Sequence, residues 1–488
     1  MADGATLSAI FCVRPIFAQC GVCRKKHKTE IFTMSEYRIY DSIKSGKRGH
    51  VSFHTPGHKG GGALSALFSV CGDDVTELSY TDELGSPSGP IAEAQSDIAM
   101  IAGAKRAFIT TDGSTSSILS MFWAIKDRGG KIIVPRGSHK SVWNACRLFK
   151  LEPVIVQGEE RDGIVQPPDA AEIARLVAGD DDIIGMIATS PDYYGNIAPL
   201  EKYAEALHSR GKVLLVDGAH GAHLAFESGR AGYAGVYADA WADGAHKSLP
   251  TLTQGAALFV NNLSLEEGIR EGLSVFRTTS PSYPVMASVE FGYKYLASHA
   301  RDIERAKAAL GDFKERNPRL KFYPSGDWTK LCLDCAPLAC DSRKLAARLE
   351  KDGIYAEFAD GRYLVFYLSA ATGAAHFKAL SAAIDRALKQ RGMRGSYVPR
   401  KKLPVPARTY SFLYALRQPA EYVAPEEAAG RMSACNAGLM PPCMPVIAAG
   451  EIITEEAAKL LKSAPHTFGL TNGKIKVVKK NEGQIYNF

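Results

Sequence analysis

Between about residues 51 and 260 the chain alternates short, unbroken apolar runs with stretches of helical character. Strands that are apolar throughout, rather than at every second residue, are typical of a parallel sheet covered by helices on both faces. The alternation therefore predicts an α/β fold on a mostly parallel sheet. The runs with the length and composition of strands are 106–110, 131–135, 183–188, 213–216 and 255–260.

A chain of 488 residues is too long for one hydrophobic core, so we expect several domains. Pro199 and Gly211 delimit a helix inside the first domain, as expected from their preferences for helix ends. The expected divisions are an N-terminal extension at 1–35, a large domain at 36–283, a smaller α/β domain at 284–392 and a C-terminal α+β segment at 393–488.

The second half of the chain carries clear helix signals. Residues 284–311 read as one long helix, and a smaller βαβ-like unit follows, in which Asp341 caps a helix at 342–351 and residues 363–368 form a strand. In the last segment Thr454 is expected to cap a helix at 455–462. These signals predict helices and strands beyond the large sheet, grouped in smaller units.

The first 33 residues lack the features of a leader peptide. Arg14 interrupts their apolar stretch, and no clean small-residue cleavage site follows. We interpret them as an extension without a catalytic role, with Met34 as a plausible alternative start. Cys20 and Cys23 have the spacing of a zinc or redox pair, but no second pair follows at finger spacing, so we predict no metal site.

Composition excludes several classes of protein. Hydrophobic content of 46% and charged content of 23% are ordinary for a globular chain. The net charge of +7 is dispersed, which favours solvated faces over a nucleic-acid surface. No apolar run reaches the ~18 residues of a membrane span. The cysteines form no repeated framework, as expected of thiols in the cytoplasm.

Two neighbouring apolar runs end in groups of complementary chemistry. The run at 213–216 ends in Asp217, and the next, which begins at Ala238, ends in His246 and Lys247. A lysine can form a Schiff base with an aldehyde, and a carboxylate can keep a pyridine nitrogen protonated, so that the ring acts as an electron sink. The pair therefore predicts a pyridoxal phosphate (PLP) site.

A stretch rich in hydroxyl groups follows the run at 106–110. Gly113 is followed by Ser114, Thr115 and Ser116, which open an apolar helix. Backbone N–H groups, the helix dipole and hydroxyls together suit a phosphate group. An ordinary helix cap is the competing interpretation. Asp217 and Lys247, which follow in the expected order along the chain, favour phosphate binding.

Histidines follow the strand ends as well. His139 comes after the run at 131–135, where parallel sheets bind ligands, and its ring could stack on the cofactor. His220 lies between small residues and could reach the ring hydroxyl. The alternatives are a solvated loop histidine at 139 and a metal pair formed by His220 and His223, which lacks a further well-placed ligand.

Five segments together resemble the ornithine/lysine/arginine decarboxylases, which are fold-type I PLP enzymes. The resemblance extends from about residue 36 to the C-terminus, in motif order, and is strongest to the short bacterial form that resembles arginine decarboxylases. The segments are 54–60, 138–141, 217–223, 246–254 and 277–284.

The resemblance implies a role for each candidate residue. It makes Lys247 the Schiff-base lysine, His139 the ring-stacking histidine and Asp217 the pyridinium partner. It places His246 beside the phosphate, with the hydroxyls of 114–116 in the phosphate cup. Thr279 is implied to reach the phosphate from a neighbouring subunit, so that the active site lies in the interface of a homodimer or a higher homo-oligomer.

The chain departs from the family pattern near the expected substrate. Gly218 replaces a glutamate, Gly244 and Ala245 occupy positions where a serine is common, and the C-terminal segment has Cys435 in place of an acidic residue and Met440 in place of a tyrosine. A carboxylate is the natural partner of a cationic substrate. These changes, together with Cys443, leave the identity of the amino acid open.

The resemblance implies decarboxylation of a basic L-amino acid to its amine and carbon dioxide, with arginine first and lysine or ornithine next, as in polyamine biosynthesis. Another PLP reaction, such as transamination or aldol cleavage on a non-basic amino acid, stays open because fold does not fix function. A catalytically idle regulatory homologue is the third possibility. The intact pair of Asp217 and Lys247 argues against it.

Overall fold

The computed structural model describes residues 37–46, 55–56, 59, 68–395, 397, 404, 406, 409–440, 444–464 and 466–480. The expected extension at 1–35, with its cysteine pair, lies outside the described residues. So do Cys443 and most of the 54–60 segment.

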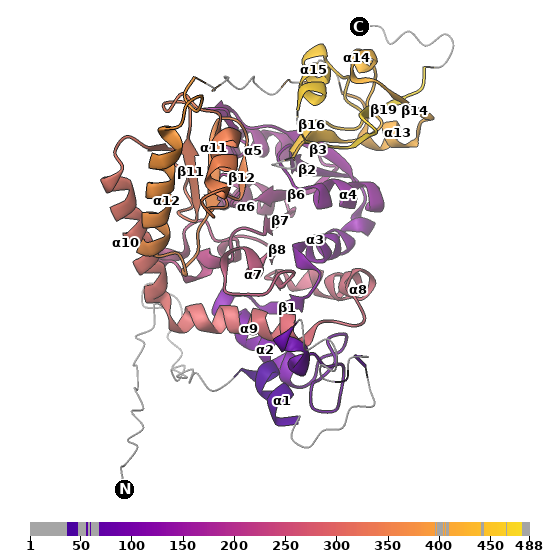
Figure 1. Ribbon diagram of the computed structural model, residues 1–488. Helices are drawn as coiled ribbons and strands as arrows, with labels where there is room; N and C mark the ends of the chain where they lie inside the picture. The colour runs from indigo at the N-terminus through magenta and orange to yellow at the C-terminus, as the bar shows by residue number, and fades with distance from the viewer. Residues whose placement is uncertain are drawn as a thin grey trace.

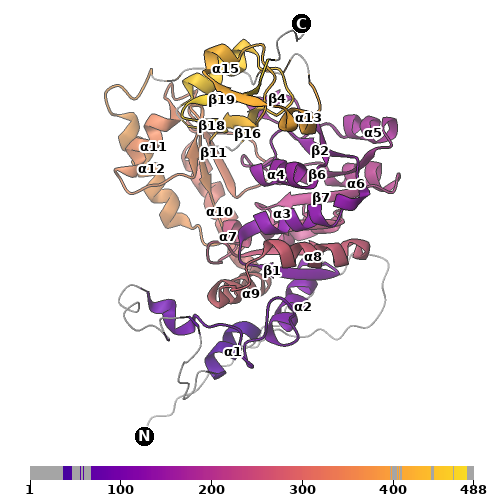
Figure 2. The ribbon, with the colours of Figure 1, turned by 90° about the vertical axis from the view of Figure 1, so that its right-hand side faces the viewer.

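A seven-stranded sheet forms the centre of the molecule, in the order β1-β9-β8-β7-β6-β2-β3 (Figures 1 and 2). β9 runs antiparallel to both of its neighbours, and the other strands are parallel, so the expected mostly parallel sheet is confirmed. The strands are β1 (Arg106–Thr110), β2 (Lys131–Pro135), β3 (Glu152–Val156), β6 (Ile183–Thr189), β7 (Val213–Gly218), β8 (Ala240–Asp243) and β9 (Ala256–Val260).

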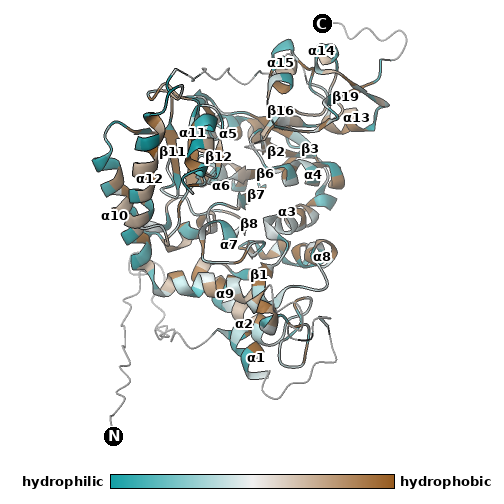
Figure 3. Cartoon of the chain, in the orientation of Figure 1, coloured by the Kyte–Doolittle hydropathy of each residue, from teal (hydrophilic) through white to brown (hydrophobic). Residues whose placement is uncertain are grey.

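Helices cover both faces of this sheet, which explains why its central strands are apolar throughout (Figure 2). One layer contains α3 (Gly113–Trp123), α4 (Lys140–Phe149) and α8 (Glu266–Phe276). The other contains α2 (Pro90–Ala102), α5 (Ala170–Gly179), α6 (Leu200–His208) and α9 (Tyr283–Ser298). Outer helices such as α8 show hydrophilic and hydrophobic colours side by side in Figure 3, as expected where one face meets solvent.

The second unit is a four-stranded sheet in the order β10-β11-β13-β12, covered by helices. All of its strand pairs are antiparallel, so the expectation of a βαβ-like unit was wrong in strand direction. Asp341 caps α11 as expected, accepting a hydrogen bond from the Arg343 backbone N–H at 2.8 Å. The elements are α10 (Ala300–Arg316), β10 (Lys321–Phe322), β11 (Lys330–Asp334), α11 (Ser342–Glu350), β12 (Phe358–Ala359), β13 (Tyr363–Tyr367) and α12 (Ala374–Leu388).

The single helix expected at 284–311 is two helices, α9 and α10. His299 separates them with a non-helical backbone (φ −122°, ψ 39°). Its ring stacks on Tyr295 at 4.2 Å, and its Nδ1 lies 3.0 Å from the Tyr295 carbonyl oxygen. Local side-chain contacts therefore stabilise a break that hydrophobic periodicity does not reveal.

The C-terminal part contains two small three-stranded sheets, β14-β19-β18 and β16-β15-β17. Thr454 caps α15 as expected, accepting from the Ala457 backbone N–H at 3.1 Å. A buried ion pair between Arg136 and Glu451 joins this part to the end of β2, with Nη1 and Oε2 3.0 Å apart. The elements are α13 (Phe412–Arg417), β14 (Ala420–Val423), α14 (Pro425–Ala428), β15 (Ala437–Leu439), β16 (Met444–Ile447), α15 (Glu455–Ser463), β17 (Thr467–Phe468), β18 (Leu470–Thr471) and β19 (Lys474–Val478).

The three groups of sheets lie at 106–260, 321–367 and 420–478. The domain limits at 283/284 and 392/393 stay predictions. Among the described residues, none of the helices is both long and apolar enough to cross a bilayer.

Candidate active site

The carboxyl ends of the parallel strands bring the predicted residues to one edge of the sheet. β7 and β8 pair so that Asp217 lies opposite Ala242. Directly after β8, the short helix α7 (Ala245–Ser248) carries Lys247. The backbone N–H of His246 donates to the Gly255 carbonyl oxygen at 3.0 Å, which fixes α7 against the start of β9. Local pairing thus places Lys247 one strand from Asp217.

Lys247 lies against a buried histidine. Its Nζ is 3.1 Å from Nε2 of His220, whose side chain is enclosed by the rings of Tyr193 and Tyr367 at centroid distances of 5.2 and 5.4 Å. Burial, and then the cations of Lys247 and Lys330, hold the pKa of His220 well below its usual value. The imidazole is therefore uncharged near neutral pH and can accept a hydrogen bond from the amine.

The charges of Asp217 and Lys247 have opposite effects on the pKa of a second imidazole, that of His139. Burial lowers the pKa of His139; Asp217 opposes this effect, and Lys247 adds to it. His139 begins α4 and accepts from the Ser141 backbone N–H through Nδ1 at 3.3 Å, which holds its ring in place. The Asp217 carboxylate is itself buried and accepts from the Ala219 backbone N–H at 3.2 Å.

The expected phosphate cup is the start of α3. Gly113 takes a positive φ of 68°, which glycine adopts without strain, and its N–H donates to the Gln254 carbonyl oxygen at 2.9 Å. Asp112, at the N-cap position, makes no side-chain bond to the helix and accepts instead from the Thr278 N–H at 3.4 Å. The first turn of α3 therefore has no side-chain cap and can bind an anion.

The three hydroxyl residues of the cup differ in exposure. Thr115 is exposed, Ser114 is half-buried and Ser116 is buried, with its Oγ donating to the Gly113 carbonyl oxygen at 3.3 Å. Ser114 and Thr115 are thus the more accessible donors.

Several buried polar atoms near these residues have no hydrogen-bond partner among the described residues. They are Nδ1 of His220, Oγ of Ser138 and Oγ1 of Thr189. Thr189 lies opposite Asp217 in the register of β6 and β7. A buried polar atom left unpaired costs about 1–3 kcal/mol, so the arrangement favours a polar ligand. An uncapped helix, a buried carboxylate and a half-buried lysine match the groups that a phosphate-bearing pyridine ring requires.

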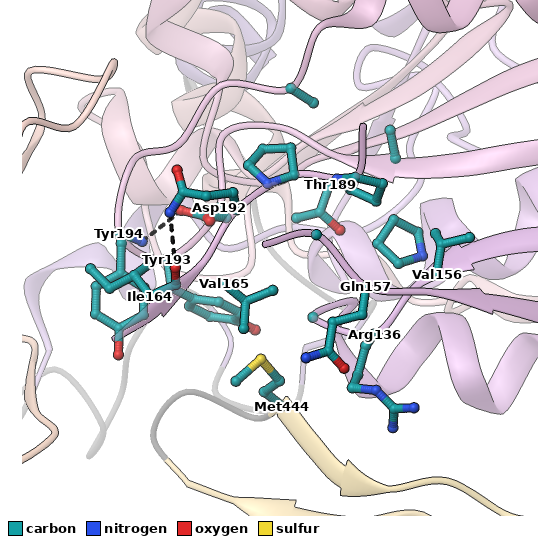
Figure 4. A pocket seen from close by; sticks show the side chains of 18 of the residues that line it. Arg136, Val156, Gln157, Ile164, Val165, Thr189, Asp192, Tyr193, Tyr194 and Met444 are labelled. Carbon is teal, nitrogen blue, oxygen red and sulfur yellow. Dashed lines mark hydrogen bonds between the residues drawn. The ribbon is translucent and has the colours of Figure 1, made fainter. Parts of the chain in front are cut away.

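A cavity adjoins this cluster at the ends of β2, β3 and β6 (Figure 4). Arg136, Gln157, Thr189 and Met444 surround it, together with Tyr193, whose ring also contacts His220. Met444 comes from the C-terminal part, so residues far apart in the sequence meet beside the predicted site. The sequence patterns did not indicate this cavity.

Three other candidate residues belong to other segments of the chain. Thr279 is exposed in the segment between α8 and α9. Cys435 donates through its thiol to the Gly469 and Lys476 carbonyl oxygens, both at 3.6 Å, and Met440 is 44% exposed. These two belong to the C-terminal sheets.

In the described part of the chain, Nε2 of His220 and Nε2 of His223 each contact a different partner, which does not support the metal-pair alternative. Nε2 of His223 lies 2.9 Å from Asp327, and Nε2 of His220 faces Lys247. Within the described ranges, no group of three or more histidine, cysteine or acidic side chains is arranged to hold a metal.

Sequence reasoning missed Tyr193, Tyr367, Asp327 and Lys330, which surround His220 from outside the large sheet. The available signal was weak: Asp327 and Lys330 are charged residues close to an apolar run, a pattern found at many strand starts.

Comparison with known proteins agrees with this arrangement. The family model described as "Orn/Lys/Arg decarboxylase, major domain" matches residues 40–314. The uncharacterized protein YaaO of Bacillus subtilis (strain 168) is 31% identical over 470 residues, covering 89% of this chain and 95% of YaaO. The arginine decarboxylase of the same organism is 28% identical over 454 residues, covering 86% of this chain and 92% of that protein.

Solved structures agree on the fold. The crystal structure of the Francisella novicida lysine decarboxylase LdcF matches with a TM-score of 0.76 at 17% sequence identity, covering 91% of this chain and 81% of that chain. The expected fold-type I architecture is confirmed by this likeness. With the match to the family model, it shows that the chain belongs to the Orn/Lys/Arg decarboxylase family of amino-acid decarboxylases.

Proposed function

We propose that this enzyme decarboxylates a basic L-amino acid with pyridoxal phosphate bound at Lys247, arginine being the first candidate and lysine and ornithine the next. One observation carries the proposal: Nζ of Lys247 lies 3.1 Å from Nε2 of the buried His220, directly after β8, and the buried carboxylate of Asp217 lies at the same edge of the sheet on the neighbouring strand β7. The arginine decarboxylases among its relatives support the choice of substrate class.

Each residue would contribute binding or orientation. Pyridoxal phosphate supplies, when bound, an electron sink for cleavage of a bond at Cα. Asp217 would hold the proton at the ring nitrogen, and the ring of His139 would fix the plane of the heterocycle. The uncapped start of α3, with Ser114 and Thr115, would bind the phosphate, with His246 beside it.

The uncharged imidazole of His220 suits the reactive amine. An amine must lose its proton before it can attack an aldehyde, and an imidazole that is neutral near pH 7 can accept a hydrogen bond from it. The tyrosine rings around His220 exclude water from that side, which strengthens the contact.

The decisive experiment measures carbon dioxide release by the purified holoenzyme from a panel of all common amino acids. We expect release from arginine, lysine or ornithine, loss of turnover and of the lysine–cofactor absorption band in Lys247→Ala, and no change in Lys459→Ala, an exposed lysine of α15. Keto-acid formation instead of carbon dioxide would favour transamination, and failure to retain cofactor would favour an idle homologue.

A second candidate is decarboxylation of a non-basic amino acid. Cys435, in place of the family's acidic residue, donates its thiol to backbone carbonyls and brings no charge to a substrate. The same panel separates the two candidates, since turnover confined to uncharged amino acids would select this one.

We further propose a cytoplasmic homodimer or higher homo-oligomer in which Thr279 reaches the phosphate cup of the neighbouring subunit. Thr279 is exposed in a single chain, and Thr115 of the cup is exposed as well. Thr279→Arg and Lys247→Ala should each be inactive alone and regain activity when their subunits are mixed, because one site of the hybrid is then intact. If mixing restores nothing while hybrids form, the shared site is wrong.

A further inference from the structure

Asp327 and Lys330 form a buried ion pair at the start of β11, in the smaller sheet. Oδ2 of Asp327 is 3.0 Å from Nζ of Lys330, and its Oδ1 lies 2.9 Å from Nε2 of His223. Thr329 donates to Asp327 through its backbone N–H at 2.8 Å and its hydroxyl at 2.7 Å. None of these four residues is more than 3% exposed. Nothing in the proposed function above uses this pair.

Three contacts connect this pair to the reactive lysine. Lys330 begins β11 and pairs with Tyr367 of β13, and its ammonium group lies 4.7 Å from the centre of the Tyr367 ring. The Tyr367 ring meets the ring of His220 edge-on at 5.4 Å. Nε2 of His220 is 3.1 Å from Nζ of Lys247. The smaller sheet therefore contacts the reactive lysine through one tyrosine and one histidine.

Stability alone does not account for such a pair. Replacing a buried ion pair by apolar residues is often neutral or stabilising, because desolvating two charges costs about as much as their attraction returns. A buried ammonium group near an uncharged histidine is thus better explained by its effect on that histidine.

Four titratable or charged residues affect the pKa of His220. Lys247 of α7, Lys330 of β11 and His139 at the start of α4 each oppose its protonation, and Asp327 favours it. Burial has the largest effect, and the net result is a pKa well below the usual value for histidine. Lys330 and Asp327 are the two of these charges that do not belong to the predicted cofactor residues, and of the two only Lys330 opposes protonation of His220.

We propose that Lys330 is a positioning residue for Lys247: anchored by Asp327, it fixes Tyr367 against His220 and so keeps that imidazole in place as an acceptor for the reactive amine. This inference rests on the proposed function, in which Lys247 bears the cofactor. Loss of the Lys330 charge should raise the pKa of His220 toward its usual range. A protonated imidazole could no longer accept from Lys247, so the amine would react more slowly below neutral pH.

The test uses a double variant, Asp327→Asn/Lys330→Met, which removes both charges together and leaves no carboxylate without its cation. Lys314→Met is the matched control, because Lys314 lies over Phe322 at 5.6 Å in the same unit without contact to His220. Two measurements are made: the pH dependence of kcat/KM in the holoenzyme, and the rate at which acetic anhydride labels Lys247 in the apo-protein.

We expect the acidic limb of the pH profile to move upward in Lys330→Met and to move less in the double variant, because loss of Lys330 raises the pKa of His220 and loss of Asp327 lowers it. Labelling of Lys247 at pH 6.5 should fall several-fold, while Lys314→Met should leave both measurements within twofold of wild type. Tyr367→Phe keeps the ring and should also change both measurements little. Tyr367→Ala removes the ring and should show the same fall in labelling of Lys247. It provides a second test if the double variant folds poorly.

The inference is overturned if the double variant and Tyr367→Ala both match Lys314→Met in pH profile and labelling. Failure of the proposed function is distinguishable from this result. If Lys247→Ala keeps turnover and the absorption band, the proposed function falls; if Lys247→Ala is inactive and the Lys330 and Tyr367 variants behave as the control does, only this inference falls.

Discussion

Two carboxylates end neighbouring strands of the large sheet and differ in what surrounds them. Asp217 on β7 and Asp243 on β8 are both buried, at 3% and 0% exposure. Asp217 accepts a hydrogen bond from the Ala219 backbone N–H at 3.2 Å, and its charge opposes the lowering of the His139 pKa. Asp243 instead accepts hydrogen bonds at Oδ2 from Tyr293 at 2.9 Å and Tyr233 at 3.3 Å. Asp217 thus accepts from a backbone N–H group, and Asp243 accepts from two hydroxyl groups.

The difference has a chemical consequence. Burial raises the pKa of Asp243 to about 7, although the two tyrosine hydroxyls oppose this effect. A carboxyl group that holds its proton near neutral pH cannot serve as the anionic partner of a ring nitrogen. A carboxylate at the carboxyl end of a strand is therefore not by itself a suitable partner for the ring nitrogen. The face of the sheet on which its side chain lies decides which role it can have.

The pleat of the two strands explains this separation and also accounts for one departure from the family pattern. Asp217 pairs with Ala242, and Gly218 with Asp243, so each pair occupies its own face. A Cβ atom at position 218 would lie 3.0 Å from Oδ1 of Asp243. The carboxyl group of Asp243, on the neighbouring strand, therefore occupies the space that a glutamate side chain at position 218 would need.

The largest expected effect separates the two carboxylates by activity. Asp217→Asn should lower kcat/KM about 10²- to 10⁴-fold, because losing one partner of a buried charge pair costs about 3–5 kcal/mol. Asp243→Asn should stay within a few-fold of wild type at pH 7. Steady-state kinetics of both holoenzymes on the best substrate measures this, and equal losses would remove the distinction between the two residues.

The second effect concerns the space that Asp243 fills. Gly218→Glu should destabilise the fold by roughly 3 kcal/mol or more, because it forces a second buried carboxyl group against Asp243. Adding Asp243→Ala should recover a large part of the lost stability. Thermal unfolding of the single and double variants measures the coupling, and strictly additive effects would show that the two positions do not share one space.

The third effect is a dependence of stability on pH. The pKa of Asp243 is raised to about 7 in the folded chain, against an ordinary value of 3.8. Between these two values the folded state binds a proton that the unfolded state has released, so this residue makes stability fall as pH rises. The stability of Asp243→Asn relative to wild type should therefore improve from pH 5 to pH 8, as measured by urea unfolding. A constant difference across this range would show that Asp243 is already ionised.

The smallest effect tests the hydroxyl partners. Tyr293→Phe removes the hydrogen bond at 2.9 Å and should cost about 1–2 kcal/mol, whereas Tyr233→Phe removes the one at 3.3 Å and should cost less. Chemical denaturation of the two variants gives their order. The opposite order would mean that Tyr233 is the main partner of Asp243.

The large sheet could be predicted because its strands are apolar on both faces and its functional groups follow the strand ends. β3 escaped prediction because Pro153 interrupts it and three of its five side chains are only partly buried. The break at His299 depends on a ring contact with Tyr295, which periodicity does not encode. The contact of Tyr367 with His220 joins residues 147 positions apart, so only the packed structure reveals it.

The most direct test of the account is the position of the covalent bond to the cofactor. Borohydride reduction of the holoenzyme, followed by proteolysis and mass spectrometry, should find the phosphopyridoxyl group on the peptide that contains Lys247. An adduct on Lys330 or on any other lysine, or no adduct in an enzyme that releases carbon dioxide, would contradict the central claim.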